Sequence, residues 1–261
     1  MAAGRRWVLQ MAVPLHPEPI ILRQEDFMRR LNSTWLSLVF VGITAGVCRA
    51  TEDGFVSLFD GQTLNGWTVN RLPKDQELAV KAWSVDSGTI YANTTGHKEH
   101  FYIMLATNRE YGDFVLRLRF QVERGMTGNS GIQIRSCYNP QTGWMEGPQI
   151  DIHGPSPQQT GRLWNEGPGP HRWLSNEPNK DQRWFYTGEG EGWNDLEITA
   201  QGMRIKSVLN DTTVVDYDGT GVLDDELHRK ANIGSRGMIG LQIHSGEEIR
   251  LRFKDIRIKE L

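Results

Sequence analysis

Three short runs of alternating apolar and polar residues carry the side chains best suited to chemistry. Residues 131–135, 149–153 and 241–244 each place isoleucine or leucine on one side and polar groups on the other, as a half-buried strand does. The polar members are Gln133, Arg135, Gln149, Asp151, His153, Gln242 and His244. If the three runs lie in one sheet, these side chains form a concave polar patch that can grip a polyhydroxylated ligand and move protons.

Four of these residues are candidates for catalysis. Asp151 can serve as a general acid or base if a desolvated cleft raises its pKa, or it can orient a histidine or a metal. Arg135 can bind a developing oxyanion or neutralise Asp151. His153 and His244 share the polar side of apolar strands, and although a lone histidine is usually structural, two on one face support each other. Asn129 lies in the turn that caps the first run and is a further candidate for substrate binding.

The sequence leaves the cofactor unknown. Asp151 and His153, two residues apart on a strand, share a face as metal ligands often do, so a divalent metal is one option. There is no closely spaced HExxH motif, and no glycine run has the strand-to-helix context that cradles phosphate. No order of Ser, His and Asp defines a catalytic triad.

The chain has nine tryptophans, a residue whose face stacks on pyranose rings. Trp67 and Trp83 lie within strand-like runs, which favours core packing. Trp164 lies between Arg162 and Asn165 in an irregular stretch and is the better candidate for a sugar platform. For Trp193, at the start of a strand, core packing and sugar binding are evenly balanced.

The elements that must position these residues are strands. From residue 55 onward, short apolar or alternating runs are separated by Gly, Asn, Asp and Pro, which predicts an antiparallel all-β domain with no helix longer than one turn, near residues 224–230. Residues 155–192 lose the alternation, but their tryptophans favour an ordered loop. The predicted core comprises Phe114, Leu116, Leu118, Ile132, Ile134, Ile150, Ile152, Leu241, Ile243 and Phe253.

The first 50 residues resemble a leader. Met28 is followed by two arginines, an apolar run over residues 35–47, and small residues at Cys48 and Ala50, the order of a signal peptide. The apolar run is shorter than the roughly 20 residues that span a bilayer. We therefore expect an upstream extension and signal peptide over residues 1–50, and a single domain over residues 51–261. That domain would be exported to the bacterial periplasm or secreted, with no transmembrane segment after cleavage.

Charge and cysteine content narrow the function classes. The formal net charge is −3, and loss of residues 1–50, with six arginines and three acidic residues, makes it −6. A mildly acidic chain argues against a nucleic-acid partner. Only Cys137 remains after residue 50, so no intrachain disulfide forms, and a single domain of about two hundred residues must rely on its core.

Six blocks occur in the order found in a known family: FVSLFDGQTLNGW, GNSGIQIR, GPQIDIHG, TGRLW, WNDLEITAQGMRIKSVLND and IGLQIHSG with LRFKDIRIKEL. Over residues 55–261 the chain resembles the 3-keto-disaccharide hydrolase family. The resemblance implies a concanavalin A-like jelly roll of two antiparallel sheets, in an exported bacterial protein that binds carbohydrate and acts on 3-keto-glycosides. Family members often carry Glu and Gln where this chain has Gln149 and Asp151, which shifts the carboxylate by one side-chain position on the same face.

A ketone at C3 of a glycoside acidifies the C2 proton, so the bond at C1 can break by elimination through an enediolate, followed by addition of water. This needs a base, donors for the C3 oxygen and an acid for the leaving oxygen. As a hypothesis for these roles, His153 or Asp151 is the base, Arg135 with Gln149 supplies the donors and His244 is the acid. The substrate-binding candidates are Asn129, Gln133, Gln149, Trp164, Glu166, Trp193 and Gln242.

Two alternatives remain. Asp151 and Glu166 are the candidate pair for ordinary two-carboxylate glycoside hydrolysis. A non-catalytic carbohydrate-binding module has the same fold and uses the same aromatic and amide residues. The cluster of ionisable groups favours an enzyme.

Overall fold

The computed structural model describes residues 54–261 except residue 155 and residues 176–183 and 187–191. The predicted upstream extension, signal peptide and cleavage site lie outside the described residues.

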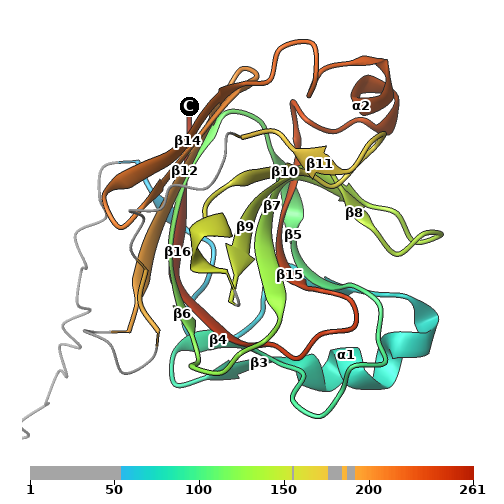
Figure 1. The fold of residues 1–261 in the computed structure, drawn as a ribbon, viewed down its shortest axis with the longest axis vertical. Helices are drawn as coiled ribbons and strands as arrows, with labels where there is room; N and C mark the ends of the chain where they lie inside the picture. Colours follow the sequence, from blue (N-terminus) through green and yellow to red (C-terminus); the bar gives the residue numbers. More distant parts are fainter. Residues whose placement is uncertain (1–53, 155, 176–183, 187–191) are drawn as a thin grey trace, which may run out of the picture. The chain divides into compact units, whose positions relative to one another are not determined.

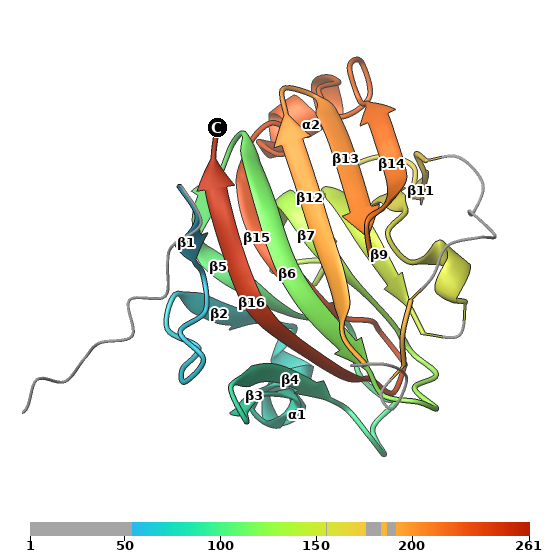
Figure 2. The same cartoon turned by 90° about the vertical axis from the view of Figure 1, so that its left-hand side faces the viewer.

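Two antiparallel sheets make up most of the described chain (Figures 1 and 2). The first has the strand order β14-β13-β12-β6-β16-β4-β3, with β1 also paired to β16. Its strands are β1 (Val56–Ser57), β3 (Trp83–Asp86), β4 (Thr89–Asn93), β6 (Phe114–Val122), β12 (Asn194–Gln201), β13 (Arg204–Leu209), β14 (Thr212–Asp218) and β16 (Arg250–Glu260). Figure 2 views this sheet from its outer face, with the second sheet behind it.

The second sheet has the order β11-β10-β9-β7-β15-β5-β2, with β8 paired to β7. Its strands are β2 (Trp67–Asn70), β5 (Ile103–Tyr111), β7 (Asn129–Tyr138), β8 (Met145–Glu146), β9 (Pro148–His153), β10 (Leu163–Asn165), β11 (Arg172–Trp173) and β15 (Gly237–Ile243). The three runs that carry the predicted polar patch are β7, β9 and the end of β15, and they are neighbours here. The predicted all-β sandwich of two antiparallel sheets is confirmed.

The main core lies between the sheets and follows from the alternation. In β6 every second residue is buried, so one face packs inward while the other meets solvent. All ten residues predicted for the core are buried. Trp67 and Trp83 are buried as well, as their positions within strand-like runs predicted.

Short helices are the first departure from the prediction. The unpredicted helix α1 (Gln76–Ala82) follows the 3₁₀ turn η1 (Pro73–Asp75) and buries only Ala79 and Ala82. The helix α2 (Glu226–Ala231) lies where one turn was expected, begins with a cap in which Asp225 accepts from the His228 N–H, and ends at Asn232 in the left-handed conformation. Neither is long and apolar enough to cross a membrane.

The described parts of the stretch over residues 155–192 are less irregular than expected, and the rest of it lies outside the described residues. After the 3₁₀ turn η2 (Pro157–Gln159), β10 and β11 extend the second sheet beyond β9. Their pairing places Trp164 opposite Trp173, and Trp184 is buried in the main core. The short strands therefore carry aromatic side chains to the edge of the polar patch.

Candidate active site

A pocket of about 480 Å³ lies on the face of the second sheet that points away from the main core. Its lining residues come from β7, β9, β10 and β11, from the segments that flank β5 and β15, and from loops: Tyr102, Asn129, Trp144, Gln149, Asp151, His153, Gln159, Trp164, Glu166, His171, Trp173 and His244. Most of the titratable members lie at strand ends, where β9 finishes, β10 and β15 have just ended and β5 is about to start. The sheet therefore gathers groups from distant parts of the chain into one site.

Three buried glutamines form a hydrogen-bonded layer at the pocket, where Gln149 lines the cavity and Gln133 and Gln242 lie behind it. The Oε1 atom of Gln149 accepts from Gln133 Nε2 at 2.8 Å and from Gln242 Nε2 at 2.7 Å, and Gln149 Nε2 donates to Asp151 Oδ1 at 3.2 Å. Gln133 and Gln242 therefore do not line the pocket but orient Gln149. Residue 131 must be glycine for this layer, because a Cβ there would lie 2.5 Å from Gln149 Cδ.

Asp151 is a buried carboxyl group with one unused oxygen. It is 2% exposed, and its Oδ2 atom has no hydrogen-bond partner. Burial raises its pKa to about 8, while the polar side chains of Asn129 and Gln149 act in the opposite direction and the Glu166 carboxylate raises it further. At neutral pH Asp151 carries a proton, so its free oxygen can donate a hydrogen bond into the pocket.

Glu166 is a second carboxyl group of the pocket. It directly follows β10, and its side chain is nearly buried. Burial raises its pKa to about 7, with a hydrogen bond from Trp164 acting in the opposite direction. The Nδ1 atom of His171 lies 3.9 Å from Glu166 Oε1. A group that titrates near neutrality can both give and take a proton.

His153 is held in one tautomer. Its Nδ1 atom accepts the backbone N–H of Ser156 at 3.0 Å, so the proton of the neutral ring is on Nε2. Burial lowers the pKa of His153, although Glu247 acts in the opposite direction. The neutral ring therefore offers an N–H donor, which suits a polariser of a carbonyl better than a base.

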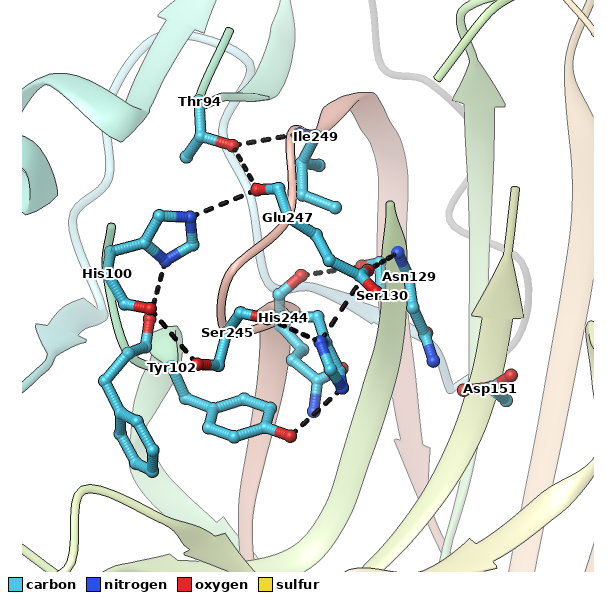
Figure 3. Close-up of polar contacts among 12 residues, drawn as sticks. Thr94, His100, Tyr102, Asn129, Ser130, Asp151, His244, Ser245, Glu247 and Ile249 are labelled. Carbon is cyan, nitrogen blue, oxygen red and sulfur yellow. Dashed lines mark hydrogen bonds and ion pairs between the residues drawn. The ribbon is translucent and has the colours of Figure 1, made fainter. Parts of the chain in front are cut away.

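His244 forms a pair with Tyr102, a residue that the sequence analysis did not identify (Figure 3). The Tyr102 Oη atom lies 3.0 Å from His244 Nε2, and His244 Nδ1 lies 3.0 Å from the Ser245 carbonyl oxygen. Burial, together with the charges of Glu166 and Glu247, raises the pKa of Tyr102, so it stays a phenol.

Aromatic side chains line the pocket on two sides. On one side Tyr102 and Trp144 lie with ring centroids 4.4 Å apart, and on the other Trp164 and Trp173 meet edge to face at 5.0 Å. Trp164 is half-buried and lines the pocket, in agreement with its predicted position. Trp144, Trp173 and His171 were not predicted, because only the strand pairing brings them to Trp164 and Glu166.

Arg135 does not face the pocket, and the prediction that it shares a face with Gln133 is wrong. Its φ of 48° marks a bulge in β7, where the register with β15 shifts, so the alternation breaks. The fully buried guanidinium instead joins three turns and a carboxylate. It donates to the carbonyl oxygens of Gly112 at 2.7 Å, Gly202 at 2.5 Å and Gly234 at 3.2 Å, and to Asp113 Oδ1 at 2.7 Å.

Trp193 also lies away from the pocket. The Nζ atom of Lys254, a residue of β16 in the first sheet, lies 4.0 Å from its ring centroid. The structure thus brings together all of the predicted site residues except Arg135 and Trp193, with Gln133 and Gln242 in the layer behind.

Among the described residues, no group of three or more His, Cys, Asp or Glu side chains is arranged to hold a metal ion.

Comparisons with known proteins agree with this architecture. The model of a family described as a 3-keto-alpha-glucoside-1,2-lyase-like domain matches residues 54–259. No curated protein sequence matches the chain.

Solved structures share the fold at low sequence identity. A "putative glycosyl hydrolase" from Parabacteroides distasonis ATCC 8503 has a TM-score of 0.57 at 18% identity, covering 80% of this chain and 94% of its own. A second from the same organism has a TM-score of 0.54 at 21% identity, covering 79% and 99%. A Bacillus subtilis protein of unknown function with a galectin-like fold has a TM-score of 0.52 at 8% identity, covering 76% and 90%. These likenesses confirm the jelly-roll sandwich.

Proposed function

Since the chain belongs to the family of 3-keto-alpha-glucoside-1,2-lyase-like domains, we propose that it is an enzyme that cleaves 3-keto-glycosides by elimination and hydration. The observation that carries the proposal is Asp151, a protonated buried acid whose unpartnered oxygen lies at the pocket. An acid kept neutral in this way is a strong donor to a developing oxyanion.

The first step removes the proton at C2 and places negative charge on the C3 oxygen. Asp151 and His153, two residues apart on β9, supply the donors for that oxygen through Oδ2–H and Nε2–H. This assignment replaces the roles of Arg135 and Gln149 expected from the sequence, because Arg135 lies elsewhere and Gln149 is occupied in orienting Asp151.

The base is at the opposite side of the pocket. With Nδ1–H of His244 donated to the Ser245 carbonyl, Nε2 is the basic atom of the neutral ring and faces the Tyr102 hydroxyl. Glu166 protonates the oxygen that leaves C1 and then takes a proton from the water that adds there, a double role that its pKa of about 7 suits. The products are a 3-keto-sugar and an alcohol.

The lining also supports a substrate class. Among the described residues that line the pocket there is no lysine or arginine, whereas two carboxyl groups and four aromatic side chains are present. Aromatic walls bind the apolar faces of pyranose rings, and a site whose described lining has two carboxyl groups but no lysine or arginine disfavours anionic sugars. We therefore propose neutral 3-keto-glycosides as substrates.

The test compares turnover of a 4-nitrophenyl 3-keto-glucoside with that of the parent glucoside. The wild-type protein should cleave the keto form far faster, and Asp151→Ala and His153→Ala, which remove the two donors, should lower turnover by a factor of about 10² to 10⁴. Both variants should still bind the sugar in a titration calorimeter. Asp60→Ala, a matched change in an exposed turn, should retain full activity.

Other outcomes identify the rival functions. Equal cleavage of keto and parent forms, with loss in Glu166→Gln, would indicate ordinary two-carboxylate hydrolysis. Binding of both sugars without turnover, with and without added divalent metal, would indicate a carbohydrate-binding module that needs Trp164 but tolerates loss of Asp151.

We also propose that the protein is exported, with cleavage after Ala50, on the order of charged, apolar and small residues in the leader. Mass spectrometry of the protein from a periplasmic fraction should find Thr51 as the first residue. Recovery of residues before Ala50 in that fraction would contradict cleavage there.

A further inference from the structure

His244 has both ring nitrogens engaged by the protein. Because the carbonyl oxygen of Ser245 can only accept, Nδ1 carries the proton of the neutral ring. Nε2 is then an acceptor, and the group within its reach is the Tyr102 hydroxyl at 3.0 Å. The hydrogen bond between them gives a proton a direct path between the pocket and His244 through Tyr102.

Tyr102 is held where it can make that transfer. It lines the pocket and is only 7% exposed, with its ring against Trp144 at 4.4 Å and Phe101 at 5.0 Å between centroids. It immediately precedes β5, whose first residue, Ile103, pairs with Ile243 beside His244. With its O–H directed at His244, the hydroxyl oxygen presents its lone pairs to the pocket as an acceptor.

Glu247 lies on the far side of the same imidazole. Its Oε2 atom is 3.6 Å from His244 Nδ1 and also accepts the backbone N–H of Asn129 (Figure 3). Its carbonyl oxygen accepts from Thr94 Oγ1 at 3.0 Å and lies 3.1 Å from His100 Nε2. The carboxylate is thus fixed at the place where positive charge on the ring would develop.

We propose that Tyr102 is the catalytic residue that takes the C2 proton from the sugar and that Glu247 is a positioning residue for the His244 imidazolium formed in the same step. This deepens the proposed function and rests on it. The C2–H bond breaks, its proton forms a new O–H bond on Tyr102, and the former Tyr102 proton moves to His244 Nε2. The electron pair of the C2–H bond enters the enediolate. Tyr102 is neutral before and after.

The relay also closes the cycle. When water adds at C1 of the unsaturated sugar, C2 requires a proton. The imidazolium returns its Nε2 proton to Tyr102 as the hydroxyl gives its own proton to C2, which restores the starting state. Glu166 handles the leaving oxygen and the water separately. The relay gives C2 one proton for each that it takes, and the protons on Tyr102 and His244 exchange with solvent water between the two halves, so the proton that C2 receives comes from solvent.

The test isolates proton removal from cleavage. The probe is 1,5-anhydro-3-ketoglucitol, which has no aglycone at C1 to leave, and the measurement is exchange of its C2 proton in D₂O by NMR. Tyr102→Phe should slow exchange by a factor of about 10² to 10⁴ while the dissociation constant of the probe changes little. Tyr111→Phe, the same change within β5 and away from the pocket lining, should exchange like wild type.

Two further variants extend the relay beyond Tyr102. His244→Gln should match the loss in Tyr102→Phe, and the double variant should be no slower than either single variant, because the two residues act as one unit. If one of the single variants folds poorly, the other still tests the relay, because each interrupts the same proton path. Glu247→Gln, which keeps an oxygen for the Asn129 N–H but removes the charge, should lower kcat on a 3-keto-glycoside by less than Tyr102→Phe does and leave KM unchanged.

The failures of the two proposals are distinguishable. If wild type binds the probe but does not exchange its C2 proton, the proposed function is wrong and the relay with it. If wild type exchanges and folded Tyr102→Phe exchanges as fast, another group takes the proton and the relay is wrong. A rise in KM with unchanged kcat in Glu247→Gln would overturn the role given to that carboxylate.

Discussion

Replacing Asp151 by asparagine is expected to stabilise the protein, by an amount that grows with pH. Asparagine keeps an oxygen for the Gln149 N–H and places an N–H donor where the protonated carboxyl has its O–H. It differs from Asp151 in that it never ionises. The wild-type residue must either hold its proton or bury a charge, and this requirement destabilises the folded state.

The sign and size follow from the two pKa values. The pKa of Asp151 is raised from 3.8 to about 8 in the folded protein, so between these values the native state binds more protons than the unfolded chain. Wild-type stability therefore falls as pH rises through this window, by at most about 1.4 kcal/mol per pH unit. Between pH 5 and pH 7.5 the free energy of unfolding of Asp151→Asn should gain about 3 kcal/mol on wild type.

Urea unfolding of both proteins at the two pH values measures this gain. The carboxyl of Asp60 is the control, because hydrogen bonds from Thr63 lower its pKa from 3.8. Its contribution to stability is fully present above that range, so the difference between Asp60→Asn and wild type should not change between pH 5 and pH 7.5. A difference between Asp151→Asn and wild type that is equally constant would refute the account of Asp151 as a protonated donor.

Three further substitutions test separate parts of the site. Trp164→Ala should weaken sugar binding about tenfold, or about 1.4 kcal/mol, in calorimetry, with a nearly unchanged melting temperature; a collapse in stability would make Trp164 a core residue. Arg135→Met should lower the free energy of unfolding by about 3 kcal/mol or more, because three carbonyl oxygens and Asp113 lose their donor, while KM of the folded fraction stays the same. Gly131→Ala should displace Gln149 and lower kcat at 3-keto-glycoside saturation, and wild-type turnover would show that the glutamine layer does not orient Asp151.

Much of the site was predictable because alternation reports directly on sheet faces. In β9 the buried Ile150 and Ile152 face the main core, which forces Gln149, Asp151 and His153 to the other side. Adjacency of β7, β9 and β15 then assembled the patch. Sequence reasoning succeeded wherever a strand has one apolar face and an unbroken register.

The prediction for Arg135 was wrong because a bulge breaks the register in the middle of β7. The residue with a positive φ is not glycine, so the usual sequence signal for such a break was missing. The prediction for Trp193 was wrong because no neighbouring residue in the sequence indicates which sheet its ring contacts.

Tyr102 was missed for a different reason. It belongs to a second apolar cluster, on the outer side of β5, together with Met104, Ala106 and Met145. With Ile103 and Leu105 in the main core, this strand is buried on both faces and shows no alternation. Its pairing with His244 depends on a contact between residues 142 positions apart.

The central claim is that this pocket breaks the C2–H bond of a 3-keto-glycoside, and a deuterium label at C2 tests it most directly. The measurement is the rate of cleavage by the wild-type protein of a 4-nitrophenyl 3-keto-glucoside with hydrogen or deuterium at C2, under single-turnover conditions. The account predicts that deuterium slows cleavage and that cleavage in D₂O replaces the C2 hydrogen of the product by deuterium. Equal rates for both substrates, with the C2 hydrogen retained in the product, would contradict it.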